Sequence, residues 1–316
     1  MQFVFGLNAL QSLKHTGVLT MGAFDGLHLG HQHVLSRLLQ RARSMQLAAG
    51  ALVFEPQPAE YFLGDKAPPR LMGLREKVQG FADLGLDYAV CLRFNTALRQ
   101  MSAREFVETV LVAGLRVQHV IIGDDFRFGC DRQGDYAFLQ SVGAALGFSV
   151  ENSQTLSDAA GRISSTRIRE AVHAGALAEA ESLLGRPYWR CGRVIYGRQL
   201  GRDLGFPTLN IKMGSRPVAV SGVYVVWLWH QGQRYPGIAN VGRRPTVSER
   251  SAINLEVHVL DNTLDLYGEF VRVDFLEKVR EEQTFPSLED LQIQIRRDAE
   301  CARVYFAKLS SSSDIH

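Results

Sequence analysis

The sequence has few cysteines, and none is placed as disulfide-bonded or metal-bound cysteines usually are. Cys91, Cys130, Cys191 and Cys301 are the four cysteines in 316 residues, and they lie far apart without a CxxC pair. Small disulfide-rich domains and zinc fingers bring cysteines together at short, regular spacings. We therefore interpret all four as free thiols of a protein from a reducing compartment.

A marked excess of charge is also lacking. The chain has 35 Lys and Arg against 33 Asp and Glu, which gives a formal net charge of +2 at pH 7. Proteins that bind nucleic acids usually have a strongly basic surface. The sequence therefore predicts no nucleic-acid partner, and any anion that the chain binds is expected to be small and held in a local basic pocket.

Long apolar runs are absent as well. No window approaches the roughly 18 consecutive apolar residues of a membrane-spanning helix. The N-terminal segment MQFVFGLNALQSLKH lacks the basic region and the sustained apolar region of a signal peptide. We expect a cytoplasmic protein with no membrane partner, acting as a monomer or a weak homo-oligomer.

What is present indicates two domains, because 316 residues exceed what one hydrophobic core usually serves. Over residues 1–185, short apolar segments alternate with amphipathic segments, and one of the latter opens on a capping-box pattern at Ser102 and Glu105. The strand-like segments are Val18–Met21, Ala51–Phe54, Tyr88–Leu92, Val117–Ile122 and Phe148–Val150. This alternation predicts an α/β domain, a doubly wound and mostly parallel sheet of the Rossmann-like, nucleotide-binding type.

The pattern changes over residues 186–309, where strand-like segments follow one another without helices between them. They are Gly192–Tyr196, Val223–Trp229, Gln233–Ile238, Ile253–Leu260 and Phe270–Phe275. Such spacing predicts a small antiparallel β-barrel, closed by an amphipathic helix over Ser287–Lys308. Residues 310–316 are predicted to form a disordered tail.

The stretch Met21–Leu35, MGAFDGLHLGHQHVL, lies where the first strand turns into the first helix. Helix N-termini at the carboxyl ends of parallel strands attract phosphate groups. Gly22 and Gly30 would let the backbone approach a ligand, and His28 and His31 are spaced to share one side of the first helical turn. Two alternatives to phosphate binding remain. The two histidines could bind zinc, for which a third ligand would be needed, or they could simply cap the helix.

These motifs carry a family resemblance. Gly22–His31 resembles the HxGH signature of nucleotidylyltransferases, and Ile163–Arg169, ISSTRIR, resembles their second signature. Phe54–Pro58, FEPQP, and Gly123–Gly129, GDDFRFG, narrow the resemblance to the bacterial bifunctional riboflavin kinase/FAD synthetase family.

The second half of the chain extends that resemblance. Gly201–Asn210, GRDLGFPTLN, and Gly237–Thr246, GIANVGRRPT, are similar to segments of the kinase module, so the resemblance runs from about Phe3 to Leu309. One departure is Asp261–Leu264, DNTL, where many relatives carry an aromatic residue.

The resemblance implies that the N-terminal domain transfers AMP from ATP to FMN and releases FAD and pyrophosphate. His28 and His31 are the catalytic candidates, as hydrogen-bond donors to the ATP phosphates. Further candidates for binding ATP and its phosphates are Gly22, Phe24, Asp25, Gly30, Ser164, Ser165, Thr166, Arg167 and Arg169. Arg167 is preferred over Arg169, which a helix turns to another side, and Asp25 is an alternative magnesium ligand. Candidates for flavin contacts are Pro56, Pro58, Asp125, Phe126 and Phe128, although one of the two phenylalanines is expected to fill the core.

The C-terminal domain is implied to phosphorylate riboflavin with ATP and Mg²⁺. Thr208 and Asn210 are two residues apart, so an extended segment would point both toward the metal ion. Glu256 is the candidate general base, although its alternating strand by itself favours a merely outward-facing glutamate. The remaining candidates are Gly197, Gly201 and Gly205 for phosphate, and Arg280 for the flavin.

Three other functions compete with this interpretation. An adenylyltransferase with a purely structural barrel would not need Pro207–Asn210, PTLN, or Glu256, and the chain keeps both. A non-catalytic flavin-binding protein would be expected to lose His28–His31, HLGH, or Ser164–Arg169, SSTRIR, which are also intact. A nucleic-acid-binding barrel would be more basic.

Overall fold

The computed structural model describes residues 1–14, 16–197, 205–214, 216–243 and 253–313, although of residues 243, 312 and 313 only the backbone is described. It has two compact units, one formed by Met1–Pro68 and Gly73–Ser165, the other by Pro69–Met72 and Thr166–His316. The sequence placed the boundary later, at 185/186. The helices α7 (Ser165–Ala174) and α8 (Leu177–Leu184) fall almost wholly in the second unit, where α8 packs against barrel strands.

The first unit is built on a six-stranded parallel sheet with the order β1-β4-β3-β2-β5-β6. Its strands are β1 (Gln2–Phe5), β2 (Gly17–Met21), β3 (Ala48–Glu55), β4 (Tyr88–Arg93), β5 (His119–Gly123) and β6 (Ser149–Ser153). The chain adds strands to one side of β2 through β3 and β4, and to the other side through β5 and β6. In open α/β sheets, ligands bind where the strand order reverses in this way, so β2 marks the expected site.

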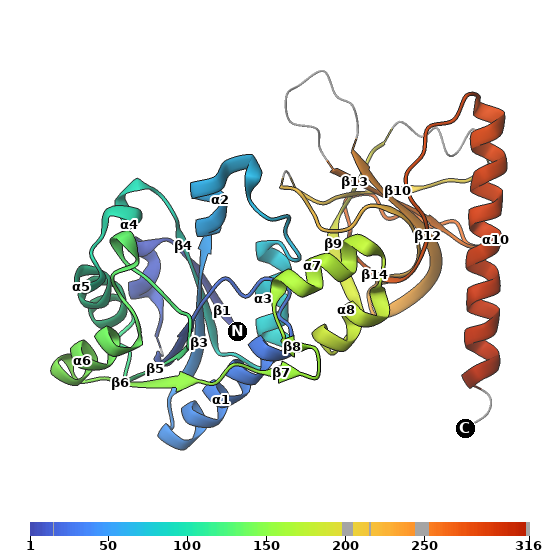
Figure 1. The fold of residues 1–316 in the computed structure, drawn as a ribbon. Coiled ribbons are helices and arrows are strands. Elements are labelled where there is room, and N and C mark those ends of the chain that lie inside the picture. The colour runs from blue at the N-terminus through green and yellow to red at the C-terminus, as the bar shows by residue number, and fades with distance from the viewer. Residues whose placement is uncertain (15, 198–204, 215, 244–252, 314–316) are drawn as a thin grey trace. The chain divides into compact units, whose positions relative to one another are not determined.

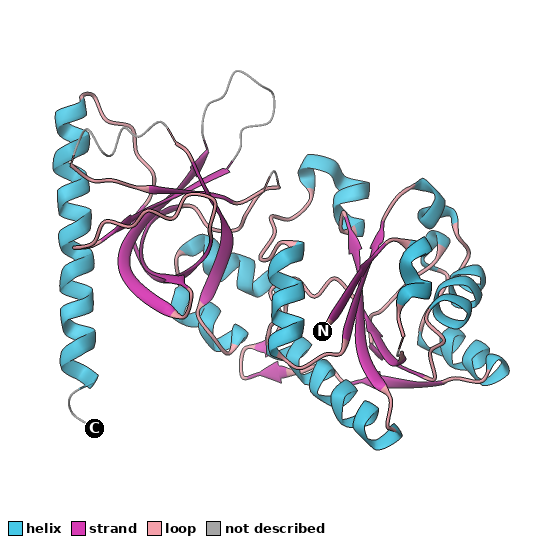
Figure 2. Ribbon diagram, turned by 180° about the vertical axis from the view of Figure 1, so that it is seen from behind, coloured by secondary structure: helices cyan, strands magenta, loops and turns pink. Residues whose placement is uncertain are grey.

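Helices flank both faces of this sheet (Figure 2), which confirms the predicted doubly wound fold. They are η1 (Leu7–Ser12), α1 (Leu29–Met45), α2 (Pro58–Leu63), η2 (Gly64–Lys66), α3 (Leu74–Asp83), α4 (Thr96–Gln100), α5 (Ala103–Phe106), the π-helix η3 (Val107–Gly114), η4 (Cys130–Arg132) and α6 (Tyr136–Leu146). A short hairpin follows, with strands β7 (Ser157–Asp158) and β8 (Gly161–Arg162). The capping box that opens α5 forms as predicted, with Ser102 Oγ accepting from the Glu105 N–H and Glu105 Oε2 accepting from the Ser102 N–H.

The second unit contains a closed antiparallel barrel with the order β10-β13-β12-β11-β14-β9 (Figure 1), as the sequence predicted. Its strands are β9 (Tyr188–Ile195), β10 (Leu209–Lys212), β11 (Gly222–His230), β12 (Gln233–Arg243), β13 (Ile253–Val259) and β14 (Phe270–Arg280). The closing helix α10 (Leu288–Ser313) packs against β11 and β12. Val223, Val225 and Ile238 form a small buried core with Ala299 and Ala302 of this helix.

Helix α10 extends into the segment that the sequence assigned to a disordered tail from residue 310. The Ser310 and Ser311 hydroxyls donate back to the carbonyl oxygens of Phe306 and Lys308. These bonds give both hydroxyl groups a partner within the preceding turn of the helix. Residues 314–316 lie outside the described part of the chain. In that part, no helix is long and apolar enough to cross a membrane.

Candidate active sites

The turn between β2 and α1 has an unusual backbone. Phe24 and Leu27 have φ values of 47° and 45°, a region that residues with a side chain rarely adopt. Both side chains are buried, and Leu27 fits closely against Gly80 of α3. The packing of these two side chains therefore stabilises the strained backbone of the turn. This turn places the next residue, His28, at the start of α1.

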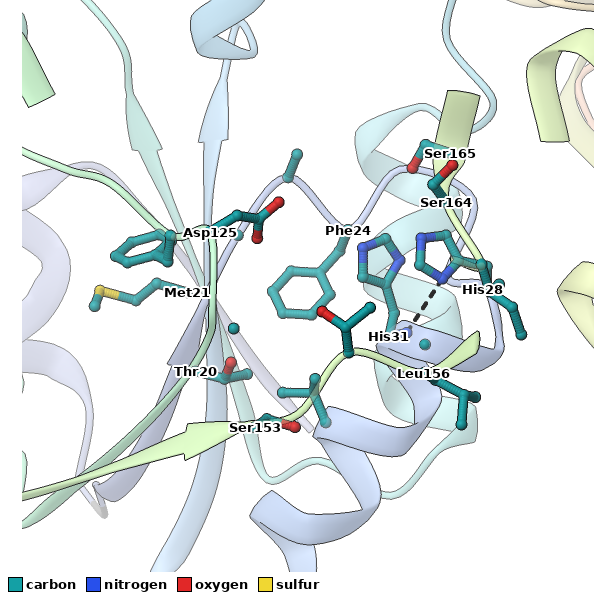
Figure 3. A pocket seen from close by; sticks show the side chains of 18 of the residues that line it. Thr20, Met21, Phe24, His28, His31, Asp125, Ser153, Leu156, Ser164 and Ser165 are labelled. Atoms are coloured by element: carbon teal, nitrogen blue, oxygen red, sulfur yellow. Dashed lines mark hydrogen bonds between the residues drawn. The ribbon is translucent and has the colours of Figure 1, made fainter. Parts of the chain in front are cut away.

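His28 is the N-cap of α1, and its Nδ1 accepts a hydrogen bond of 3.3 Å from the backbone N–H of His31 (Figure 3). The two rings are stacked, with centroids 3.6 Å apart and planes inclined by 17°. Gly30 leaves room for this arrangement, because a Cβ there would lie 3.1 Å from the His28 ring. Since Nδ1 is an acceptor, the proton of the neutral His28 ring is on Nε2, which remains a donor.

The buried His31 side chain favours its neutral form. Its pKa lies well below the usual value, first because burial disfavours the charged ring, and then because a positive charge on His28, were that ring protonated, and those on Lys77 and Arg162 oppose another positive charge nearby. Its Nδ1 is buried without a hydrogen-bond partner among the residues that the structure describes. The same residues contain no group of three or more His, Cys, Asp and Glu that could hold a metal ion, so the zinc alternative finds no third ligand there.

A pocket of about 480 Å³ lies at this turn, at the carboxyl ends of the strands β2 and β5. The predicted site residues that line it are Gly22, Phe24, His28, Gly30, His31, Pro58, Asp125, Phe126, Ser164 and Ser165. Asp25, Pro56 and Phe128 are not among the residues that line it. The sequence reasoning did not identify further lining residues, among them Thr20, Phe54, Arg132, Ser153, Thr155 and Arg162.

Asp25 and Ser165 connect two of the predicted motifs. The Ser165 hydroxyl donates to the Asp25 backbone carbonyl at 2.8 Å, so the ISSTRIR segment meets the turn after β2. The Asp25 side chain is buried. Thr166, Arg167 and Arg169 belong to the second compact unit, where Arg169 Nε donates to the Pro69 carbonyl at 2.8 Å; their phosphate roles therefore stay predictions.

The structure separates the two aromatic residues of the GDDFRFG segment. Phe128 is buried in the core against Phe106, whereas Phe126 stacks on Phe128 and lines the pocket. Beside them, Asp125 forms an ion pair of 2.8 Å with Arg162. Arg162 directly precedes the ISSTRIR segment, so a basic residue next to that motif was the signal that could have identified it.

The candidate residues of the barrel lie on neighbouring strands. Asn210 of β10 pairs with Glu256 of β13, and Glu256 pairs in turn with Asn240 of β12. On β13, Leu255 and Val257 are buried, whereas Glu256 is half-buried on the opposite face. That face is covered, since Glu256, Asn240 and Thr208 line a pocket of about 390 Å³ together with residues of α10.

The predicted phosphate-binding glycines have different environments. Gly197 lies against the Asn210 carboxamide, because a Cβ there would be 2.3 Å from Asn210 Nδ2. Gly205 adopts a φ of 83°, which favours glycine. Gly201 lies outside the described residues.

Arg280 lines the same pocket, but its guanidinium is bound to a partner within the protein. Its Nε and Nη2 donate to the Asp298 carboxylate at 2.7–3.1 Å, and its Nη1 donates to the Glu281 carbonyl at 3.0 Å. Phe206 and His258 also line the pocket and were not predicted. The His258 ring contacts the Pro207 carbonyl through Nδ1 at 2.9 Å, which fixes the segment that leads to Thr208. The pocket that contains Asn262–Leu264, part of the departure from the family, is a separate one of about 130 Å³.

Comparisons with known proteins agree with this division of the chain. The FAD synthetase family model matches residues 10–167, and the riboflavin kinase family model matches residues 184–306. The chain is 46% identical over 307 residues to a bifunctional riboflavin kinase/FMN adenylyltransferase of Pseudomonas fluorescens, covering 97% of this chain and 98% of the relative. It is 44% identical to the enzyme of that description from Escherichia coli K12, with 97% and 98% covered.

Among solved structures, a crystal structure described as a macrolide-efflux protein from Streptococcus pneumoniae superposes with a TM-score of 0.79 at 28% identity. It covers 96% of this chain and 99% of the other, and the likeness bears on the fold. The pockets, the two family matches and the full-length relatives lead to one conclusion. The chain belongs to the family of bifunctional riboflavin kinases/FMN adenylyltransferases, with the adenylyltransferase in its N-terminal half and the kinase in its C-terminal half.

Proposed function

We propose that the pocket at the β2–α1 turn forms FAD from FMN and ATP, and that the outer face of the barrel at β10 and β13 phosphorylates riboflavin. The observation that carries the first assignment is the stacked pair of His28 and His31 at the switch point of the parallel sheet. The second rests on Glu256 and Asn210, which are partners on adjacent strands beside a pocket.

In the first reaction, a phosphate oxygen of FMN attacks the α-phosphorus of ATP, and the bond from that phosphorus to the β-phosphate oxygen breaks. Negative charge grows on the departing pyrophosphate, so the protein contributes positioning and hydrogen-bond donors rather than a covalent nucleophile. His28 supplies Nε2–H, and His31 supplies a second ring that burial keeps neutral. Ser164 and Ser165 line the same pocket and add hydroxyl groups.

The flavin is proposed to lie along Phe126, Pro58 and Asp125, which also line this pocket. Phe126 stacks on the buried Phe128, so its ring is held in one place as a platform for an aromatic ligand. The Asp125–Arg162 ion pair contributes both a carboxylate and a guanidinium to the pocket wall.

In the second reaction, Glu256 takes the proton of the riboflavin 5′-hydroxyl. The hydroxyl oxygen bonds to the γ-phosphorus, and the bond to the oxygen that bridges the β- and γ-phosphates breaks to release ADP. Glu256 and Thr208 line one pocket, which is large enough to bring a hydroxyl to the carboxylate. Arg280, fixed by Asp298, is proposed to border the flavin.

The residues of the barrel fit a magnesium ion. Mg²⁺ binds through hard oxygen atoms, often with one or two protein ligands besides phosphate oxygens and water. The Thr208 hydroxyl and the buried Asn210 carboxamide offer such a pair of oxygen ligands and would hold the ion. A bound Mg²⁺ would neutralise part of the negative charge of the ATP phosphates. Asn210 Oδ1 accepts a hydrogen bond from Asn254, which holds the carboxamide in position.

The assignment is tested by incubating pure protein with riboflavin, ATP and Mg²⁺ and separating riboflavin, FMN and FAD by chromatography over time. Replacing His28 and His31 together by Ala should abolish FAD while FMN still accumulates. Asn210→Ala should abolish FMN formation, yet still convert supplied FMN to FAD. Loss of both activities in either folded variant would contradict the assignment of separate sites.

We also propose that the enzyme acts in the cytoplasm, as a monomer or a weak homo-oligomer. The balanced charge and the four free cysteines support that location. The two family matches leave residues 168–183 between them, which supports a domain boundary near the predicted position at 185/186.

A further inference from the structure

The side chains of Glu256 and Asn210 share a third residue that the activities do not explain. Asn254 lies two residues before Glu256 on β13, so both side chains project from the same face of the strand. Asn254 Nδ2 donates to Glu256 Oε1 at 2.5 Å and to Asn210 Oδ1 at 3.3 Å. A carboxamide nitrogen has two hydrogens, so these two bonds use its whole donor capacity.

We propose that Asn254 is a positioning residue of the kinase site, which holds the carboxylate of Glu256 and the carboxamide of Asn210 in one fixed relation. This inference rests on the proposed roles of Glu256 as base and Asn210 as metal ligand. Asn254 touches neither substrate nor metal in this scheme, and it acts only through the two residues that it binds.

The strand pairing shows why one amide can serve both residues. Glu256 faces Asn210 directly across the β10–β13 pair, and Asn254 faces Lys212 two residue pairs further along, on the same face. The Asn254 side chain therefore stands beside the Glu256–Asn210 pair on the same face, within reach of both oxygens. Gly197 lies against the same Asn210 carboxamide, since any Cβ at position 197 would collide with it.

Without Asn254, the carboxylate and the carboxamide each lose a charge-assisted or neutral hydrogen bond and gain rotational freedom. Misplacement of a reacting group or ligand by about 1 Å can cost about 10²-fold in rate. Removing an outer-shell partner of a metal ligand typically costs about 10- to 100-fold in activity. The loss should appear in the chemical step rather than in riboflavin binding.

The experiment compares Asn254→Ala, Asn254→Asp and Glu256→Gln in the full-length enzyme. We expect Asn254→Ala to lower kcat for riboflavin phosphorylation by about 10- to 100-fold while KM for riboflavin changes less than about threefold. Conversion of supplied FMN to FAD should stay at the wild-type rate in the same preparation, which shows that the chain is folded. Lys212→Ala, opposite Asn254 on β10, is the matched control for disturbed strand pairing and should keep kcat.

Asn254→Asp keeps the size of the side chain but replaces the donor by a second carboxylate beside Glu256. A like charge disfavours ionisation of such a pair, so the acidic limb of the pH profile of kcat should move to higher pH. Movement of this limb would show that position 254 contacts the group whose ionisation limits kcat, whereas the fall in kcat without a change in KM in Asn254→Ala is the result that a merely structural role would not give.

The outcomes distinguish the positioning role of Asn254 from the proposed role of Glu256 as general base. If Asn254→Ala and Asn254→Asp keep wild-type kcat and pH profile while Glu256→Gln is inactive, the positioning role is refuted and the base assignment stands. If Asn254→Ala raises only KM, the residue serves riboflavin binding and the inference is wrong. If Glu256→Gln remains fully active, the proposed function of Glu256 fails instead.

Discussion

Replacing His28 by Ala and by Ser separates its two roles. As N-cap of α1, His28 accepts the backbone N–H of His31 through Nδ1, a bond that Ser can replace and Ala cannot. Losing an N-cap costs about 1 kcal/mol in the free energy of unfolding. For a unit of 150–250 residues this corresponds to a fall in Tm of about 2–4 °C, so Ala should melt that much below Ser. Loss of the buried ring itself is common to both variants and cancels in the comparison.

The catalytic role of His28 should be lost equally in both variants. Neither Ser nor Ala supplies the Nε2–H donor, and removing one donor to a developing oxyanion costs about 10²–10³ in kcat. FMN adenylylation is measured by chromatography, Tm by calorimetry, and riboflavin phosphorylation in the same sample serves as the folding control. Recovery of adenylylation by His28→Ser to near the wild-type rate would refute the donor role, and equal Tm values would refute the capping role.

Three further predictions concern individual contacts. Gly197→Ala should abolish riboflavin phosphorylation but not FAD synthesis from FMN, because its Cβ would lie 2.3 Å from Asn210 Nδ2; wild-type FMN production would contradict this. Gly50→Ala should lower the free energy of unfolding of the first unit by about 1–3 kcal/mol, since its Cβ would lie 2.1 Å from the Tyr88 ring, and calorimetry that shows no shift would exclude the overlap. Burial lowers the pKa of His119, so the folded state binds the proton of this ring less well than the unfolded state does. The contribution of His119 to the free energy of unfolding should therefore be complete above about pH 6.5 and should fall as the pH drops below that value. Melting curves between pH 8 and pH 5 should show a weaker pH dependence in His119→Phe.

The fold could be predicted well because its signal is local. Alternation of buried strands with amphipathic helices identified the parallel sheet, and the capping pattern at Ser102 identified the start of α5. The end of α10 could not be found in this way. A run of serines has no apolar periodicity that would predict a helix, yet α10 includes Ser310 and Ser311, whose hydroxyls donate to carbonyl oxygens of the preceding turn.

The sequence identified site residues that lie within one contiguous motif. It did not identify those whose place depends on contacts between segments that are distant in the sequence. Which of Phe126 and Phe128 fills the core depends on the pairing of Phe128 with Gly134, where any Cβ would collide with the Phe128 ring. Periodicity placed Glu256 opposite the buried residues of β13, and this is where it lies. The pattern of one strand carries no information on α10, which covers that face and turns it into a pocket.

His28 shows that a structural role and a catalytic role of one residue need not exclude each other. Capping α1 requires an acceptor, and Nδ1 meets that need only when it carries no proton. The same hydrogen bond therefore fixes the tautomer with the proton on Nε2, the nitrogen that we propose donates to a phosphate. A ring that carries a proton on Nδ1 could not accept this bond, so the cap and a donor on Nε2 require the same tautomer. The structural role of His28 is thus the physical cause of the tautomer that its proposed role at ATP requires.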